Sequence, residues 1–191
     1  MADPTRHTSP VRALTAQDLD AVVAIDAAAE GRTRRAYFQR RLDAALAHPA
    51  LHVQLAAADG DGLVGYILAR RTSGEFGRPL PSLRLEVVGV RDDRRGQGVG
   101  RHLLQAMAQY ATRHGVAELR TTAPWTDRRM LPWLHAMGFE LAPDQLVECA
   151  VGDGYQAERG DALALPAAES RGREIDYGAP EANDFERVGK V

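Results

Sequence analysis

The sequence predicts an α/β protein with a mixed, mostly antiparallel sheet flanked by helices. Short β-branched runs alternate apolar and polar residues, other segments repeat apolar residues at helical spacing, and Gly- or Pro-containing turns separate them. The expected element order is β-α-α-β-β-β-α-β-α-β-β. Because hairpins come first and a helical crossover between parallel strands follows, the sheet is expected to be mixed.

The first half of the chain contains one capping signal and one hairpin signal. Thr15 is followed three residues later by Asp18, which resembles a capping box with Asp in place of Glu or Gln. The sequence Asp59-Gly60-Asp61-Gly62 is typical of a tight turn between antiparallel strands. The expected elements are a strand at 11–14, helices from the cap to about 28 and over 33–47, and strands at 51–57 and 63–69.

The second half begins with residues 70–82, which are rich in Gly, Pro and Arg and are expected to form a mobile loop. A helix over 99–114 ends at His114-Gly115, where a basic last turn is followed by glycine. The other expected elements are strands at 83–90 and 118–122, a helix at 128–137 with Pro132 in its first turn, and a final strand pair at 139–141 and 146–151.

Composition limits the class of protein. The chain has 191 residues, of which 45% are hydrophobic, and a net charge of −2, so we expect a soluble domain and no nucleic-acid partner. Its single Cys149 cannot form an internal disulfide, which favours a reducing, cytoplasmic location. The sequence has no apolar run long enough to predict a membrane span. Periodicity disappears over residues 152–191, which are interpreted as a flexible tail or as an arm that docks on its own domain or a neighbour.

The most informative stretch joins the strand at 83–90 to the helix at 99–114. After the polar residues 91–95 comes a glycine corner, residues 96–101, with glycine at alternate positions. The N-terminus of a helix presents unpaired N–H groups and a partial positive charge, and glycine lets an anion approach them. These features predict a phosphate or diphosphate site. The alternative is a strand-to-helix connection in which glycine only relieves strain. Full positive charges around the corner come from Arg94, Arg95 and Arg101.

Two common glycine motifs do not match this stretch. A P-loop ends in Gly-Lys-Ser or Gly-Lys-Thr, which is absent. A dinucleotide-binding fingerprint places its glycines directly after the strand, whereas five polar residues intervene here and position 103 is Leu.

The pattern Arg95-x-x-Gly98-x-Gly100, preceded by Val90 and followed by Leu103-Leu104, resembles the acyl-coenzyme A (CoA) motif of the GNAT N-acetyltransferase family. The sequence Trp-Leu-His-Ala-Met-Gly-Phe at 133–139 resembles the second signature of that family. The resemblance covers residues 10–151 and leaves 152–191 as an extension. It implies the GNAT acyl-CoA N-acyltransferase fold and, for the domain 10–151, transfer of an acetyl group from acetyl-CoA to a primary amine by direct attack, without a metal. The acceptor would be a small-molecule amine or a protein amine, with no nucleic acid or membrane involved, and a homodimer is an open possibility.

The same resemblance places the diphosphate of acetyl-CoA on the amides of residues 96–101. It places the pantetheine arm along Val88, Gly89 and Val90, where it would bond like an added strand, with the thioester near Val88. Asp127 stands where the family often has an asparagine that holds the pantetheine. The expected cofactor-binding residues are therefore Val88, Gly89, Val90, Arg95, Gly96, Gln97, Gly98, Val99, Gly100, Arg101 and Asp127.

Glu86 is the expected catalytic residue. An attacking amine must be neutral, but a lysine-like amine has a pKa of about 10.4, so a general base is useful. Glu86 is a carboxylate in an otherwise apolar strand. The alternative is that it pairs with Arg84 or faces solvent.

The chain also departs from the family pattern. The tyrosine that many GNAT enzymes use as a proton donor is Leu134 here, and a glutamate sometimes used as a base is Thr122. The thiolate could leave unassisted, or Tyr66 or a water could serve as the acid, while His135 is expected at the surface. Cys149 is interpreted as a buried structural residue. Leu134 also leaves open a second function, that of a catalytically weak acyl-CoA-binding regulatory module.

Overall fold

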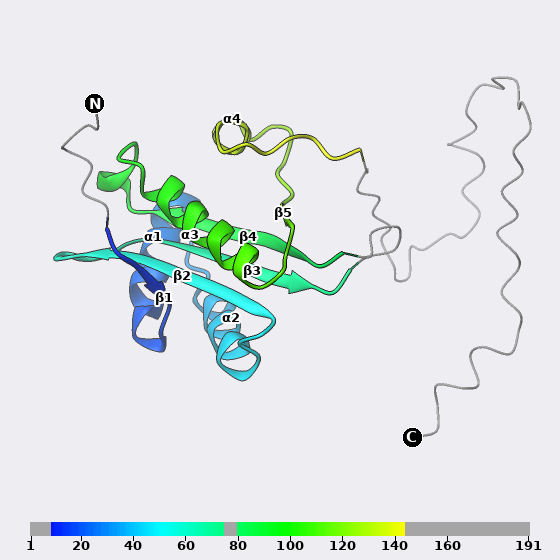
Figure 1. Ribbon diagram of the computed structural model, residues 1–191. Coiled ribbons are helices and arrows are strands. Elements are labelled where there is room, and N and C mark those ends of the chain that lie inside the picture. The colour runs from blue at the N-terminus through cyan, green and yellow to red at the C-terminus, as the bar shows by residue number, and fades with distance from the viewer. Residues whose placement is uncertain (1–8, 75–79, 144–191) are drawn as a thin grey trace, which may run out of the picture. The chain divides into compact units, whose positions relative to one another are not determined.

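The computed structural model describes residues 9–74 and 80–143, in which a five-stranded sheet holds its strands side by side in chain order (Figure 1). The first four strands pair antiparallel and the last pairs parallel to its neighbour, so the expected mixed, mostly antiparallel sheet is confirmed. The internal contacts of the chain divide it into two units, Met1–Leu141 and Ala142–Val191, and this sheet belongs to the first. The strands are β1 (Val11–Ala13), β2 (His52–Asp59), β3 (Gly62–Thr72), β4 (Ser82–Val90) and β5 (Glu118–Arg120).

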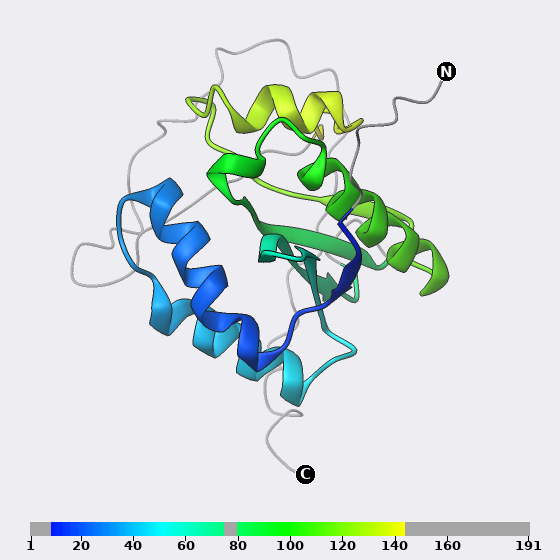
Figure 2. The same ribbon diagram turned by 90° about the vertical axis from the view of Figure 1, so that its left-hand side faces the viewer.

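Helices cover both faces of the sheet (Figure 2). The first face carries α1 (Leu19–Glu30) and α2 (Arg35–Ala47), and the second carries α3 (Val99–Arg113). The short helix α4 (Met130–Ala136) lies against the start of α3. Two apolar clusters result, one between the sheet and α3 and the other between the sheet and α1 with α2. Their most enclosed members are Ile67, Leu83, Leu103 and Met107 on the α3 side, and Val22, Phe38, Tyr66 and Leu68 on the other.

The entry to α1 follows the predicted capping box. The Asp18 carboxylate accepts hydrogen bonds from the Thr15 backbone N–H and from the Thr15 hydroxyl, both at 2.8 Å. It also forms a bidentate ion pair with Arg12, both contacts at 2.7 Å. The Arg12 guanidinium lowers the pKa of Asp18 to about 2. This connection therefore ties β1 to the first helix.

Two features of the sequence prediction are wrong. The loop expected over 70–82 is wrong at its start, because β3 continues to Thr72 and pairs with the first residues of β4. That pairing satisfies backbone groups that a loop would leave to solvent. The strand expected at 139–141 is also wrong, because no described strand lies beside it to accept its backbone bonds. Its expected partner at 146–151 lies outside the described residues.

A β-bulge interrupts β4 at Glu86. Leu68 on β3 pairs with Val87 and Ala69 pairs with Leu85, so Glu86 is the extra residue between two paired positions. Bulges redirect a side chain locally and are common beside active sites. This irregularity cannot be read from the alternation of residues along β4.

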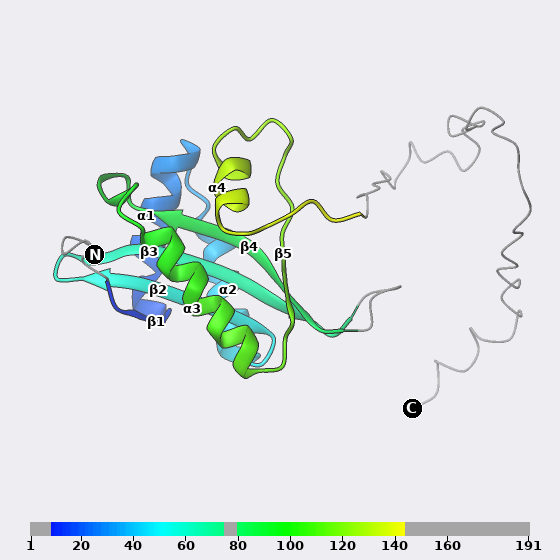
Figure 3. The ribbon, with the colours of Figure 1, turned by 45° about the horizontal axis from the view of Figure 1, so that its top comes forward.

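Strand β4 also has a free edge. β5 pairs only with Ser82–Arg84, and the last link between the two segments is the Thr121 hydroxyl, which donates to the Leu85 carbonyl at 3.1 Å. The chain then diverges toward α4 (Figure 3). From Glu86 to Val90, the β5-side edge of β4 has no strand partner in the described part of the chain. An extended ligand can pair with such an edge.

Candidate acyl-CoA site

The glycine corner presents open backbone donors at the start of α3. The chain leaves β4, forms a 3-10 turn over Asp92–Arg94 and enters α3 through Gly96 and Gly98, whose φ angles are 74° and 88°. In residues 9–74 and 80–143, no acceptor is bonded to the backbone N–H groups from Gly96 through Arg101. A Cβ added at Gly96 or Gly98 would meet nothing within 4 Å. The expected anion site is therefore sterically accessible and rich in donors.

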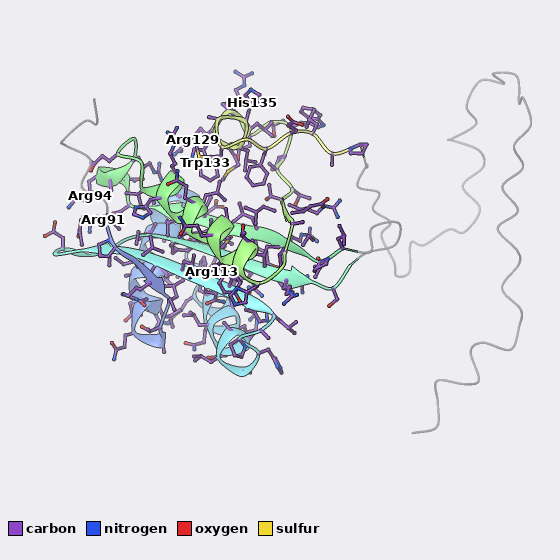
Figure 4. The ribbon with its side chains drawn as sticks, in the orientation of Figure 1. Arg91, Arg94, Arg113, Arg129, Trp133 and His135 are labelled. Atoms are coloured by element: carbon purple, nitrogen blue, oxygen red, sulfur yellow. The ribbon has the colours of Figure 1, made fainter. Side chains whose placement is uncertain are left out.

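Neighbouring arginines contribute less free charge to the corner than the sequence predicts. Arg94 pairs with Asp59 at 3.0 Å and with Asp61 at 2.8 Å, both at the turn between β2 and β3. Arg95 pairs with Asp92 at 2.6 Å and also donates from Nε to the Val90 carbonyl at 3.3 Å. Figure 4 shows Arg91 and Arg94 together at this end of the sheet. Backbone dipoles and the exposed Arg101 thus supply most of the positive potential that an anion would meet.

Gly100 serves a packing role. A Cβ there would lie 3.4 Å from Cζ2 of Trp133, so the absence of a side chain lets α4 approach the first turn of α3. In Figure 4, Trp133 points toward α3 and His135 points away from it, and His135 is exposed as expected. A cavity of about 550 Å³ extends from this region between α3 and the residues after α4, and Arg101 lines it.

Asp127 organises the start of α4. Its Oδ1 accepts the backbone N–H groups of Met130 at 2.8 Å and Arg129 at 3.0 Å. These two bonds lower the pKa of Asp127. A contact between Asp127 and pantetheine stays a prediction, and the observed role of its carboxylate is to cap the helix.

Val88, Gly89 and Val90 lie along the free edge of β4, where they are partly buried. Val88 and Val90 pack toward α3. Gly89 faces the other way, and a Cβ at this position would overlap the ring of Tyr66 on β3. The sheet can therefore place this strand directly over a large aromatic side chain only because residue 89 is glycine.

Glu86 lies in an arginine cluster that the sequence did not predict. From the bulge its carboxylate accepts a hydrogen bond from Arg41 of α2, and Nε of Arg70 on β3 lies 3.7 Å away. The second guanidinium nitrogen of Arg41 lies 3.3 Å from Nδ1 of His52. The side chains of Glu86 and Arg41 are 20% and 14% exposed. The alternative pairing with Arg84 is not observed, since Arg41 and Arg70 take that place.

Other candidate residues have structural positions. Tyr66 is only 1% exposed, and burial, followed by the nearby charge of Asp26, raises its pKa. It is thus enclosed in the core rather than available to a leaving thiolate. Leu134 is also buried in the core. Cys149 lies outside the described residues.

Two other kinds of structural feature are absent from the described residues. In residues 9–74 and 80–143, no group of three or more His, Cys, Asp or Glu side chains is arranged to hold a metal ion. No helix in that same part of the chain combines the length and apolarity that a membrane span requires.

Comparison with known proteins identifies the family. The model of the acetyltransferase (GNAT) family matches residues 19–139, and the chain therefore belongs to this family. No curated protein matches the chain. The resemblance found in the glycine corner and in residues 133–139 is thus confirmed at the level of family and fold.

Three solved structures illustrate the likeness. A transcriptional regulator from Bacillus halodurans C-125 is 19% identical, with 74% of this chain and 99% of that chain covered and a TM-score of 0.64. A ribosomal-protein-alanine N-acetyltransferase from Brucella melitensis biovar Abortus 2308 is 18% identical, with 75% of this chain and 99% of that chain covered and a TM-score of 0.60. An aminoglycoside antibiotic 6′-N-acetyltransferase from Acinetobacter haemolyticus is 15% identical, with 75% of this chain and 99% of that chain covered and a TM-score of 0.65. At these identities the likeness concerns the fold.

Proposed function

We propose that this chain is an acetyl-CoA-dependent N-acetyltransferase that moves the acetyl group to a primary amine by direct attack. The observation that carries this proposal is the adjacency of two sets of backbone groups that have no helix or strand partner in the described residues, one in the glycine corner and one on the β5-side edge of β4. The first suits a diphosphate and the second suits an extended amide-containing arm. Both N-acetyltransferases named above share the fold.

In this proposal the backbone of residues 96–101 binds the diphosphate, and that of Val88, Gly89 and Val90 pairs with the pantetheine arm. The Val88 N–H donates to the oxygen of the thioester carbonyl and stabilises the negative charge that develops there. Because these donors belong to a fixed strand, they need little reorganisation during the reaction. Arg101 supplies a full positive charge beside the diphosphate.

Glu86 accepts the proton of the incoming amine, directly or through a water. The amine nitrogen attacks the carbonyl carbon, the C–N bond forms and the C–S bond breaks, and the thiolate leaves with the electron pair and takes a proton from water. Arg41 and Arg70 hold the carboxylate of Glu86 at the bulge. Leu134 supplies no proton, since its side chain is aliphatic.

The test is consumption of acetyl-CoA by the full chain over a panel of primary amines, with the acetylated amine identified by mass spectrometry. We expect one CoA released for each amide formed. CoA release without amide formation would point to thioester hydrolysis instead.

A second function is an acyl-CoA-binding regulatory module. It is favoured by Leu134, which fills the core at the position of the family's tyrosine, and by the fold shared with a transcriptional regulator. Calorimetry separates the two functions. Tight binding of acetyl-CoA together with no turnover on any amine would favour the module.

A further inference from the structure

The register of the sheet brings four basic residues into one row. His52 on β2 pairs with Arg70 on β3, Arg70 pairs with Arg84 on β4, and Arg84 pairs with Arg120 on β5. Residues directly opposite one another on adjacent strands project from the same face of a sheet. These four residues, called here the basic row, therefore cross the sheet on a single face.

This face is the one that carries α2 and the proposed base. Arg41 of α2 contacts both His52 and Glu86, and Nε of Arg70 lies 3.7 Å from the Glu86 carboxylate. Arg84 precedes Glu86 by two residues on the same strand. Leu83 and Leu85, which flank Arg84, belong to the cluster on the α3 side. The basic row thus lies next to the point where the amine must lose its proton.

Among the described residues around Glu86, positive charges outnumber negative ones. Like charges directly opposite each other on neighbouring strands repel, so the Arg70–Arg84 pair is unfavourable unless an anion is shared between them. The single Glu86 carboxylate already serves Arg41 and Arg70. In the described part of the chain, the side chain of Arg84 has no ion pair or hydrogen bond.

The surroundings of His52 are consistent with this excess. Burial lowers the pKa of His52, and the positive charges of Arg41 and Arg70 lower it further. The Arg70 side chain is 48% exposed, so a solute can reach this part of the row from solvent.

We propose that the acceptor amine carries an anionic group, a carboxylate or a phosphate, which Arg70 and Arg84 bind while Glu86 takes a proton from the amine. This inference rests on the proposed acetyltransferase function and narrows its substrate class. The guanidinium group matches the geometry of carboxylates and phosphates, because two of its N–H groups can donate in parallel. Polycationic amines are disfavoured, since they would meet the same positive charges.

The experiment compares acceptors that differ only in the anionic group. The full chain is assayed with acetyl-CoA and β-alanine against β-alaninamide, phosphoethanolamine against ethanolamine, and spermidine as a polycation. We expect kcat/KM to be at least tenfold higher for the anionic member of one pair. The pair that shows the larger ratio distinguishes a carboxylate from a phosphate as the recognised group.

Variants then assign the preference to the basic row. We expect Arg84→Gln to raise KM for the anionic amine and to change KM for the neutral amine little. The ratio of the two kcat/KM values should therefore fall toward one. Arg84→Lys keeps the charge without the planar fork, and a smaller loss is expected. Arg71→Gln is the matched control, because Arg71 pairs with Leu83, whose side chain belongs to the α3-side cluster. It should leave the preference intact.

Two results would overturn the inference and leave the acetyltransferase function standing: equal turnover of both members of each pair, or a preference that Arg84→Gln and Arg84→Lys do not reduce. If acetyl-CoA binds and no amine is acetylated, the proposed function fails. The inference about the anionic group is then tested by calorimetry, in which each amine of a pair is titrated into the CoA-loaded protein. Equal affinities for the anionic and the neutral amine would overturn it.

Discussion

The two regions expected to meet the substrates use different chemistry. The glycine corner offers backbone N–H groups from consecutive residues, and two of its three nearby arginines are paired with aspartates. The face beside Glu86 instead uses side chains from α2, β2, β3 and β4. The first region depends on which residues are glycine, and the second depends on how distant segments are paired. Mutations should therefore affect them in separable ways.

The largest expected effect is on the side-chain region. Glu86→Gln removes the proposed base, and we expect turnover to fall by about 10²-fold or more with little change in CoA affinity. The loss should be greatest at the low end of the active pH range, where a smaller fraction of the amine is neutral. Steady-state rates across pH, with calorimetry of CoA binding, provide the measurement. Glu30→Gln is a control at an exposed carboxylate on α1, and full activity of Glu86→Gln at all pH values would exclude Glu86 from the mechanism.

The next effect tests the backbone region. Gly98→Val puts a branched side chain at a φ of 88° and into the space expected for the diphosphate. We expect CoA affinity to fall at least about a hundredfold, or roughly 2.7 kcal/mol. Gly31→Val introduces the same residue at a φ of 69° at the end of α1, far from the corner in sequence. It should carry a similar folding cost and leave CoA affinity unchanged, and equal affinities for both variants would contradict a diphosphate site at Gly98.

A third prediction concerns the strand that the two regions share. A Cβ at Gly89 would overlap the ring of Tyr66. Overpacking of this kind costs about 1–3 kcal/mol, so Gly89→Ala should lower the free energy of unfolding in urea by that amount. Gly60→Ala is the matched control, because nothing lies within 4 Å of its added Cβ. Equal stabilities of the two variants would show that Tyr66 can move aside.

The smallest expected effect is on the pH dependence of stability, through His52 in the side-chain region. Burial and the charges of Arg41 and Arg70 lower the pKa of His52, while Glu86 opposes them and His48 adds to them. A histidine whose pKa is lowered on folding contributes stability above its ordinary pKa of about 6.5, and this contribution is lost as the pH falls through the lowered value. We expect His52→Gln to flatten the dependence of unfolding free energy on pH below about 6.5. The control variant His135→Gln changes an exposed histidine and should leave the pH dependence as it is. An unchanged pH dependence in His52→Gln would argue against a positively charged environment of His52.

Local features of the chain were predictable because neighbouring residues define them. The Thr15–Asp18 cap, the hairpin at 59–62 and the apolar spacing of α3 involve residues within a few positions of one another. The open amides of the glycine corner are local in the same way, because they follow from the glycines at 96 and 98. The end of β3 at Thr72 was not predictable locally, since its strand conformation depends on pairing with Ser82.

The sequence by itself determined the family, the order of the elements from β1 to α4 and a glycine-rich turn with open amides at the start of α3. Tertiary structure decided which charges meet Glu86: its partner Arg41 is 45 residues away, and a bulge in β4 turns the carboxylate toward it. It also decided that Arg70 and Arg84 lie side by side. The physical reason is that a backbone donor is placed by its own dihedral angles, whereas a side-chain cluster is placed by register and packing between segments far apart in the chain.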